Sequence, residues 1–231
     1  MPHRQSPLCF HEEIMLLALR DEKGTVEFGS MYGYALGGAI LAELLLADRI
    51  SVEEGKKKLV NLVSDEPIGD PVINECLKKI AKAKRRAVVQ NWVQSFTSLK
   101  KLHHRIAQGL CDRGILRADE DTVLLIFRRK IYPELNPQPE RRLIERLRRA
   151  IFGDNQRIDP RTAVLISLAD GANLLAIPFN KKDLKKQKKR IEQVVNGEVM
   201  GKATKGAIEA AQAAAMVACI MPAMIAPAIA S

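Results

Sequence analysis

The sequence predicts a mainly α-helical fold: a single globular domain with a central helix bundle and one or two short β-hairpins. Of its 231 residues, 47% are hydrophobic and 28% are charged, which is typical of a globular chain. Aromatic residues make up only 4%, while leucine, alanine and isoleucine are plentiful, which favours helices over a β-sandwich. Apolar residues also recur at helical spacing in most segments.

The first segments are expected to form the centre of the core. FHEEIMLLALRDEKG places Phe10, Ile14, Leu17 and Ala18 on one face of a helix that ends at Gly24. The glycine-rich GTVEFGSMYGYALGG has the composition of a short hairpin. ALGGAILAELLLADRI is apolar on nearly every side, which predicts a buried central helix.

The next segments alternate loops with short elements. ISVEEGKKKLVNLV predicts a turn, a short helix and a strand-like piece, and SDEPIGDPV predicts a loop because prolines and a glycine lie among its acids. In DPVINECLKKIAKAK, Asp70 is expected to cap a helix that has Pro71 at its first position. VVQNWVQSF predicts a short helix that carries the single tryptophan.

The segment SLKKLHHRIAQGLCDRGIL has the densest group of cations in this region. Leu99, Leu102, Ile106 and Leu110 form the apolar stripe of a helix that ends at Gly114. Two lysines, two histidines and an arginine occupy six positions on it. The adjacent histidines suggest a metal or catalytic site, whereas the adjacent cations suggest an anion-binding site.

The remaining segments predict a hairpin and further helices. The hairpin is expected to consist of Ile115 and Leu116, a turn at ADED, and the run 123–127. PERRLIERLRRAIF predicts a basic amphipathic helix, and DPRTAVLISLADGANLL an apolar helix capped by Asp159 with Pro160 in its first turn. NKKDLKKQKKRIEQVV predicts one more basic helix, and an alanine-rich helix follows it.

The C-terminal segment AAQAAAMVACIMPAMIAPAIAS leaves two interpretations open. It is long enough for a membrane-spanning helix, which needs about 20 apolar residues. It is also alanine-rich and interrupted by Pro222 and Pro227, which favours a core helix that ends near Met221. We therefore expect one helical domain over residues 1–221 and an apolar tail over residues 222–231.

The cysteines and the N-terminus predict an intracellular protein. The four cysteines are far apart and form no CxxC pair, so we expect reduced, mostly buried thiols. Glu12 and Glu13 interrupt the apolar run near the N-terminus, so we expect no signal peptide.

The formal net charge of +10 predicts a polyanionic partner, either an anionic membrane surface, a phosphorylated ligand or nucleic acid. GILRADEDTVLLIFRR after a helix is also similar to the end of a winged-helix domain, so nucleic acid stays an alternative. Basic residues cluster at 56–58, 82–86, 100–105, 128–130, 141–149 and 181–190, the last of which is most simply a solvated face.

The residues give little support to catalysis. HEE at residues 11–13 is not the HExxH zinc motif. His103 and His104 point about 100° apart on a helix, so they are poorly placed to share one metal. Cys111 lies two turns further along, too far to pair with them as a nucleophile and base. We expect no enzyme activity, no metal and no cofactor.

Several ordered segments together resemble the Golgi phosphoprotein 3 family. They are LCFHEEIMLLALRDEKGTVEF, GGAILAELLLADRI, SDEPIGDPVINECLKKI, VQNWV, RIAQGLCDRGIL, RRLIERLRRAIF and DPRTAVLISLADGANLL. The resemblance spans about residues 8 to 217. It implies a peripheral membrane protein that binds anionic phospholipid headgroups, phosphatidylinositol 4-phosphate in the eukaryotic members, without catalysis.

The resemblance also implies a headgroup site, which uses one tryptophan and three arginines in eukaryotic members. In this sequence Gly29 stands at the tryptophan position and Gly37 at the first arginine position. Lys100 and His103 stand at the other two, with Arg105 close by. We expect Lys100, His103 and Arg105 to bind the phosphate, facing Gly29 and Gly37, and expect binding to strengthen as pH falls through about 6.5.

A hairpin near TVLLIFRRKIYPEL is expected to contact the membrane. By resemblance, Phe127, Arg128, Arg129 and Tyr132 would meet the bilayer, and residues 123–132 would mediate self-association into a homo-oligomer. One alternative is an ordinary packed hairpin with a basic edge. Another is that the protein is a scaffold whose apolar hairpin and tail hold a protein partner.

The resemblance implies a cytoplasmic protein on the cytosolic face of a membrane, the Golgi in a eukaryote or the inner membrane in a bacterium. Few residues precede the first predicted helix, so the short form is similar to the bacterial branch, and no coat-adaptor role is expected.

Overall fold

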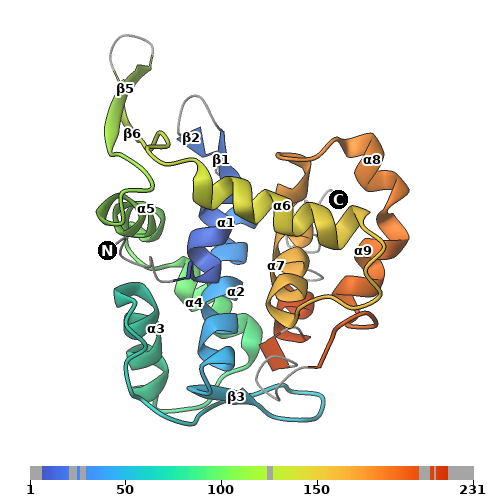
Figure 1. Cartoon of the computed structure of the whole chain (residues 1–231). Helices are drawn as coiled ribbons and strands as arrows, with labels where there is room; N and C mark the ends of the chain where they lie inside the picture. Colours follow the sequence, from blue (N-terminus) through green and yellow to red (C-terminus); the bar gives the residue numbers. More distant parts are fainter. Residues whose placement is uncertain are drawn as a thin grey trace, which may run out of the picture.

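The structure is a computed structural model, and it describes residues 7–20, 25–26, 30–123, 127–202, 209–210 and 212–217. These residues form a mainly helical fold, as the sequence predicts (Figure 1). The helices are α1 (Phe10–Ala18), α2 (Ser30–Leu46), α3 (Pro71–Ala81), α4 (Val89–Thr97), α5 (Leu102–Asp112), α6 (Gln138–Phe152), α7 (Pro160–Gly171), the 3-10 helix η1 (Leu174–Ala176), α8 (Lys181–Lys186) and α9 (Lys188–Val195).

Within the same residues, the strands form three short antiparallel pairs. The first begins before the glycine-rich segment that was expected to hold a hairpin: only its second strand lies in that segment, and residues 30–38 of the segment belong to α2. The pairs are β1 (Leu19–Arg20) with β2 (Thr25–Val26), β3 (Ile50–Val52) with β4 (Val60–Leu62), and β5 (Asp119–Val123) with β6 (Phe127–Ile131).

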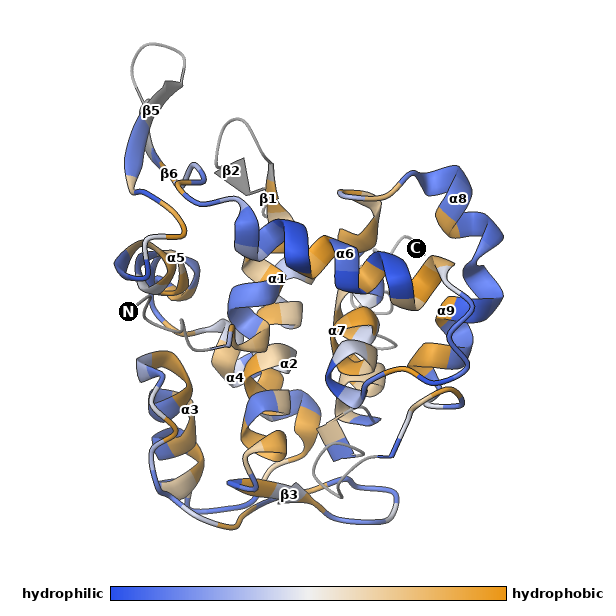
Figure 2. Cartoon of the chain, viewed as in Figure 1, coloured by the Kyte–Doolittle hydropathy of each residue, from blue (hydrophilic) through white to orange (hydrophobic). Residues whose placement is uncertain are grey.

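Helices α1 and α2 occupy the centre of the molecule, with other helices around them (Figure 1). All residues of α1 are buried, and α2 packs against α1, α3, α4 and α7. Helix α2 is apolar on nearly every side because other helices surround it, as the sequence predicts. Apolar residues face the interior, and the outer helices α6, α8 and α9 carry polar surfaces (Figure 2).

Three consecutive buried polar residues of α1 fix the helices around it. Each reaches a partner that is distant in the sequence. Charges buried this deeply are costly unless they are paired, so the three pairs tie α1 to the start of α3, the end of α5 and the middle of α6. The pairs are His11 with Asp70 (3.3 Å), Glu12 with Arg113 (2.7 Å) and Glu13 with Arg146 (2.8 Å).

The two aspartate N-caps predicted from the sequence are confirmed, whereas the first helix ends at Ala18, before the expected Gly24. The Asp70 carboxylate accepts hydrogen bonds from the amides of Val72 and Ile73, both at 2.8 Å, and Asp159 accepts one from the amide of Thr162 at 2.9 Å. Burial acts to raise the pKa of Asp70, but the hydrogen bond and charge of His11, together with the two amides, lower it.

The expected short helix in ISVEEGKKKLVNLV is wrong, because this segment forms the β3–β4 hairpin. Gly55 and Lys58 adopt positive φ angles of 118° and 48°, which reverse the chain. Arg86 then hydrogen-bonds Glu53 on one side of the reversal and Asn61 on the other. A helix of so few residues would have lacked the packing that stabilises it.

The predicted hairpin after α5 exists, but its turn is misplaced. ADED was expected to be the turn, whereas Asp119–Val123 is strand β5. In the register of the pair, Glu120 lies opposite Lys130 and Asp121 opposite Arg129. Acidic residues that face basic ones across a hairpin stabilise the pairing, so the acidic run is a strand and not a turn.

The C-terminal third also departs from the prediction in one place. The single basic helix expected over NKKDLKKQKKRIEQVV is divided at Gln187 into α8 and α9. Of the alanine-rich segment, residues 209–210 and 212–217 are helical, and Ala210, Ala213, Ala214 and Val217 are buried. In the described part of the chain, no helix has the length and apolar character needed to cross a membrane. The tail at 222–231 lies outside the described residues.

Candidate functional site

The candidate site lies at the junction between α4 and α5. Leu99 and Leu102 are buried on either side of a two-residue turn, so Lys100 and Lys101 between them are exposed. Lys101 adopts a φ of 55°, in the left-handed region. A residue other than glycine rarely adopts this conformation, and such residues concentrate at binding sites.

The two histidines follow in the first turn of α5 and connect it to the base of the β5–β6 hairpin. The rings of His103 and His104 lie against each other, with centroids 3.8 Å apart and planes tilted by 46°. His104 Nδ1 lies 2.8 Å from the hydroxyl of Tyr132, which follows β6. His104, to which the sequence assigns no role, therefore fixes the hairpin base to α5.

The lysines, and not the histidines, supply the positive charge of this site at neutral pH. Burial, assisted by the charge of His104, lowers the pKa of His103 from 6.5 to about 4. Burial also lowers the pKa of His104, with further contributions from Lys130 and Lys101. Neutral imidazoles can still donate or accept hydrogen bonds next to Lys100, Lys101 and Lys130.

Arg105, which the sequence predicts as a phosphate ligand, has a protein partner. Its guanidinium lies 2.6 Å from a carboxylate oxygen of Glu75 on α3. Both side chains are about a third or more exposed, at 34% and 43%, so the pair is accessible to solvent. In this structure the arginine holds α3 to α5, and its charge is largely balanced.

Gly37 does not form an exposed wall of the site, contrary to the expectation. It is buried in α2, where a Cβ atom would lie only 2.7 Å from the carbonyl oxygen of Val93 and 3.3 Å from Thr97 Cγ2. Glycine is needed here because α2 and α4 approach closely. The other glycine of the predicted wall, Gly29, lies outside the described residues.

Comparison with known proteins identifies the family. The family model of Golgi phosphoprotein 3 (GPP34) matches residues 10–211. The chain belongs to the Golgi phosphoprotein 3 family. A curated relative, vacuolar protein sorting-associated protein 74 of Eremothecium gossypii, is 25% identical over 217 residues, which cover 80% of this chain and 65% of the relative. The chain thus spans just under two thirds of that relative's length.

In this Golgi phosphoprotein 3 family member, the predicted membrane residues of the hairpin fall into two groups. Phe127, Arg128 and Arg129 lie in β6, and their side chains are outside the described part of the structure. Tyr132 is only 5% exposed and contacts His104, so in this structure its side chain packs against α5 and presents little surface to a bilayer. An aromatic ring with a polar hydroxyl suits both membrane interfaces and half-polar packing sites, and sequence cannot distinguish them.

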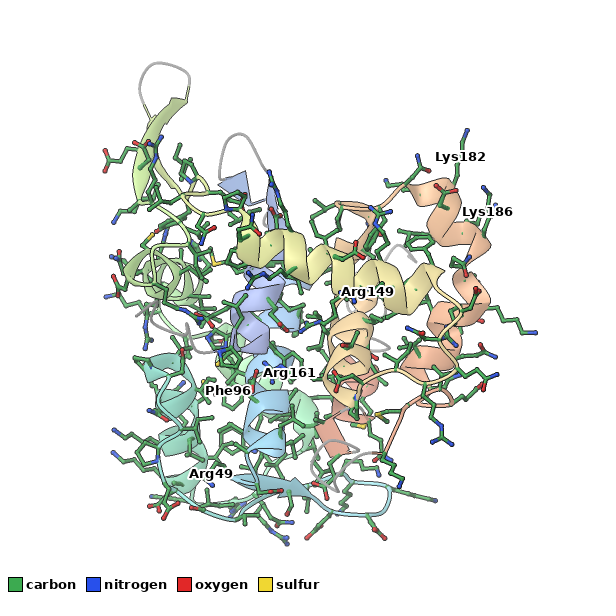
Figure 3. The ribbon with its side chains drawn as sticks, viewed as in Figure 1. Arg49, Phe96, Arg149, Arg161, Lys182 and Lys186 are labelled. Carbon is green, nitrogen blue, oxygen red and sulfur yellow. The ribbon has the colours of Figure 1, made fainter. Side chains whose placement is uncertain are left out.

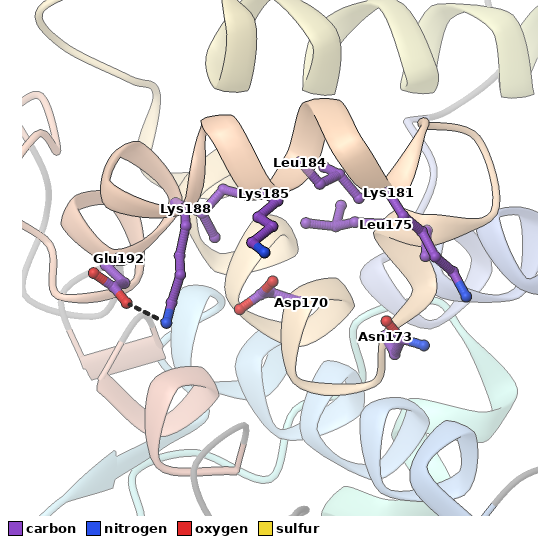
Figure 4. Close-up of a pocket in the computed structure, with 10 residues that line it drawn as sticks. Asp170, Asn173, Leu175, Lys181, Leu184, Lys185, Lys188 and Glu192 are labelled. Carbon is purple, nitrogen blue, oxygen red and sulfur yellow. Dashed lines mark ion pairs between the residues drawn. The ribbon is translucent and has the colours of Figure 1, made fainter.

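A second concave surface of this family member lies far along the chain, between α7, η1, α8 and α9 (Figure 4). It is a groove of about 410 Å³ whose apolar floor includes Leu175 and Leu184. Figure 4 shows Lys185 pointing toward Asp170, whose pKa is raised by burial and by Glu192. The groove carries charges of both signs. Across the described residues, no group of histidine, cysteine, aspartate or glutamate side chains could hold a metal ion.

Proposed function

We propose that this chain is a peripheral membrane protein that binds the phosphate of an anionic phospholipid headgroup at the α4–α5 junction. Phosphatidylinositol 4-phosphate is the first ligand to test, because the family resemblance implies it. The proposed location is the cytosolic face of a membrane, with the Golgi as the expected organelle in a eukaryotic cell. The proposal is a binding function without catalysis.

The lysine cluster is the observation that carries the proposal. Lys100, Lys101 and Lys130 are exposed, and among the described residues no ion pair is seen for Lys100 or Lys101, whereas Lys130 lies opposite Glu120 in the hairpin register. The charges of Lys101 and Lys130 both contribute to lowering the pKa of His104, after the larger effect of burial, so both lysines act on the same ring. Exposed lysines beside neutral hydrogen-bonding groups suit a phosphate monoester, which offers charge and several acceptor oxygens.

Lys101 and Lys130 belong to larger basic clusters in the sequence, and no sequence feature distinguishes them from the neighbouring basic residues. Lys101 stands out only through its backbone conformation, and Lys130 only through the strand pairing that brings it to α5. The proposed site therefore relies on lysines, in contrast to the arginine site that the resemblance implies.

Vesicle co-sedimentation tests the proposal. The charge-reversed variant Lys100→Glu/Lys101→Glu is compared with Lys56→Glu/Lys57→Glu, which makes the same change in net charge on the β3–β4 connection. We expect the first variant to bind phosphatidylinositol 4-phosphate vesicles at least about tenfold more weakly than the second, since each basic residue near an anionic surface contributes about 1 kcal/mol. Equal binding by the two variants would contradict the proposal. Tight binding to duplex DNA with no binding to vesicles would favour the nucleic-acid alternative.

A further inference from the structure

A second cationic surface extends over α6 and α8, at a distance along the chain from the α4–α5 junction. Helix α6 crosses the upper part of the molecule from the end of β6 toward α8 and α9, as Figure 1 shows. Much of α6 and most of α8 are strongly hydrophilic (Figure 2). We define the α6–α8 surface by its exposed cations, which are Arg141, Arg142, Arg148 and Arg149 on α6 and Lys181, Lys182, Lys185 and Lys186 on α8.

Aromatic contacts join the two helices into one surface. Phe179 precedes α8, and its ring lies edge-on to Phe152 at the end of α6, with centroids 5.4 Å apart. The guanidinium of Arg148 on α6 lies over the same Phe179 ring, 5.3 Å from its centroid. These contacts hold α8 beside α6, although α8 itself contributes no buried residue.

Part of this surface has no balancing negative charge. Arg149 pairs with Glu145 at 3.4 Å, and Lys186 pairs with Asp183 at 3.0 Å. Within the residues that the structure describes, no ion pair is seen for four further cations of the surface, which are Arg141, Arg142, Lys181 and Lys182. The side chains of Lys182 and Lys186 point away from the body of the protein in Figure 3.

Exposed apolar side chains accompany these cations. Leu135 is 61% exposed in the connection that leads into α6, and Ile177 is 45% exposed shortly before α8. A basic face that only contacts solvent does not require an exposed leucine or isoleucine. The phosphate backbone of a nucleic acid also offers no apolar surface for these side chains to contact. Cations combined with exposed apolar residues are typical of a surface that lies at a membrane interface.

We propose that the α6–α8 surface lies against an anionic bilayer and attracts the protein to it independently of headgroup identity. This inference rests on the proposed function, because it assumes that the protein works at a membrane. The α4–α5 junction would then select the headgroup, while the α6–α8 surface responds to the charge density of the bilayer. Screening by salt should weaken this second contribution strongly, since its charges are exposed.

Two double variants test the inference, Lys181→Glu/Lys182→Glu and Arg141→Glu/Arg142→Glu. Lys181 and Lys182 begin α8, where acidic residues are favourable, and Arg141 and Arg142 are exposed, so the variants are expected to fold. The control is again Lys56→Glu/Lys57→Glu. We expect each test variant to bind phosphatidylserine vesicles that lack phosphoinositide at least about tenfold more weakly than the control.

The outcomes separate this inference from the proposed function. Adding phosphatidylinositol 4-phosphate should still strengthen binding of the α6 and α8 variants by the same factor as for the unmodified protein. The variant Lys100→Glu/Lys101→Glu should instead lose that factor. If the α6 and α8 variants bind phosphatidylserine vesicles as well as the control does, the α6–α8 inference is wrong, whatever the junction variant does. Binding to duplex DNA that depends on these residues, without binding to vesicles, would also overturn it.

Discussion

Replacing Arg161 by methionine should destabilise the protein strongly, because the change leaves a buried carboxylate without its partner. Arg161 on α7 contacts both carboxylate oxygens of Glu43 on α2, at 2.5 and 3.2 Å. It also donates a hydrogen bond to the carbonyl of Leu8 at 2.7 Å, and its guanidinium lies 4.1 Å from the centroid of the Phe10 ring. The Glu43 side chain is only 11% exposed.

The expected cost follows from this geometry. Breaking a buried ion pair by removing one partner typically costs about 3–5 kcal/mol. The amide of Phe10 still donates to Glu43 at 2.6 Å, which compensates part of the loss, so we expect about 3–4 kcal/mol. In the double variant Glu43→Gln/Arg161→Met, no unpaired carboxylate is left at this position, and the side-chain carbonyl of the new glutamine can still accept the hydrogen bond from the backbone N–H of Phe10. We expect it to be at least about 1 kcal/mol more stable than the single variant.

Urea denaturation followed by circular dichroism measures these free energies of unfolding, provided that the slope m stays constant. Arg149→Met is the matched control, because Arg149 is 67% exposed and its pair with Glu145 should contribute under about 1 kcal/mol. The reasoning would be refuted if Arg161→Met cost no more than Arg149→Met. It would also be refuted if the Glu43 and Arg161 substitutions were simply additive.

Three further predictions concern the site and its support. Glu75→Gln should free Arg105 and strengthen binding to anionic vesicles several-fold more than Glu66→Gln, which removes the same charge elsewhere; equal effects in co-sedimentation would argue against it. Gly37→Ala should destabilise the fold by about 1–3 kcal/mol in urea denaturation despite alanine's helix propensity, and a neutral result would mean that α2 and α4 can separate. Because His103 has a pKa of about 4, its neutral form stabilises the fold fully above pH 6.5 and loses this contribution as pH falls toward 4. The headgroup phosphate itself titrates at about pH 6, so His103 is tested by the difference in vesicle binding between the protein and His103→Ala. This difference should stay constant down to about pH 5, and an increase near pH 6.5 that His103→Ala removes would contradict this.

Local signals in the sequence predicted most of the helices. Asp70 and Asp159 act within a few residues, where a cap and a following proline determine the start of a helix. The apolar periodicity of α5 was similarly sufficient, because Leu102, Ile106 and Leu110 are all buried. These features depend on the segment alone, so no knowledge of the rest of the fold was needed.

Features that depend on distant partners could not be predicted in the same way. The HEE triplet excluded a zinc motif, but nothing in it indicated that Glu12 would reach Arg113, 101 positions away. The acidic run that begins at Asp119 became a strand because a basic strand lies opposite it. The sequence places Tyr132 at the membrane and Gly37 at the headgroup site. Their burial was not predictable, because it depends on packing against α5 and α4 and not on their own neighbours in the sequence.

The packing around α5 explains how a shallow site can still bind. Buried Leu102 fixes the start of the helix, Arg105 and His104 fix its middle to α3 and to the hairpin, and Arg113 fixes its end to α1. The lysine turn therefore projects from a helix that is already held in place, so binding costs little ordering of the backbone. Three lysines on an open surface still provide only a weak, salt-sensitive attraction. A single site of this kind would dissociate readily, whereas a second surface on α6 and α8 that engages the same bilayer would make rebinding intramolecular. We therefore propose that the lysine turn at the α4–α5 junction selects the headgroup, and that the α6–α8 surface keeps the protein on the bilayer.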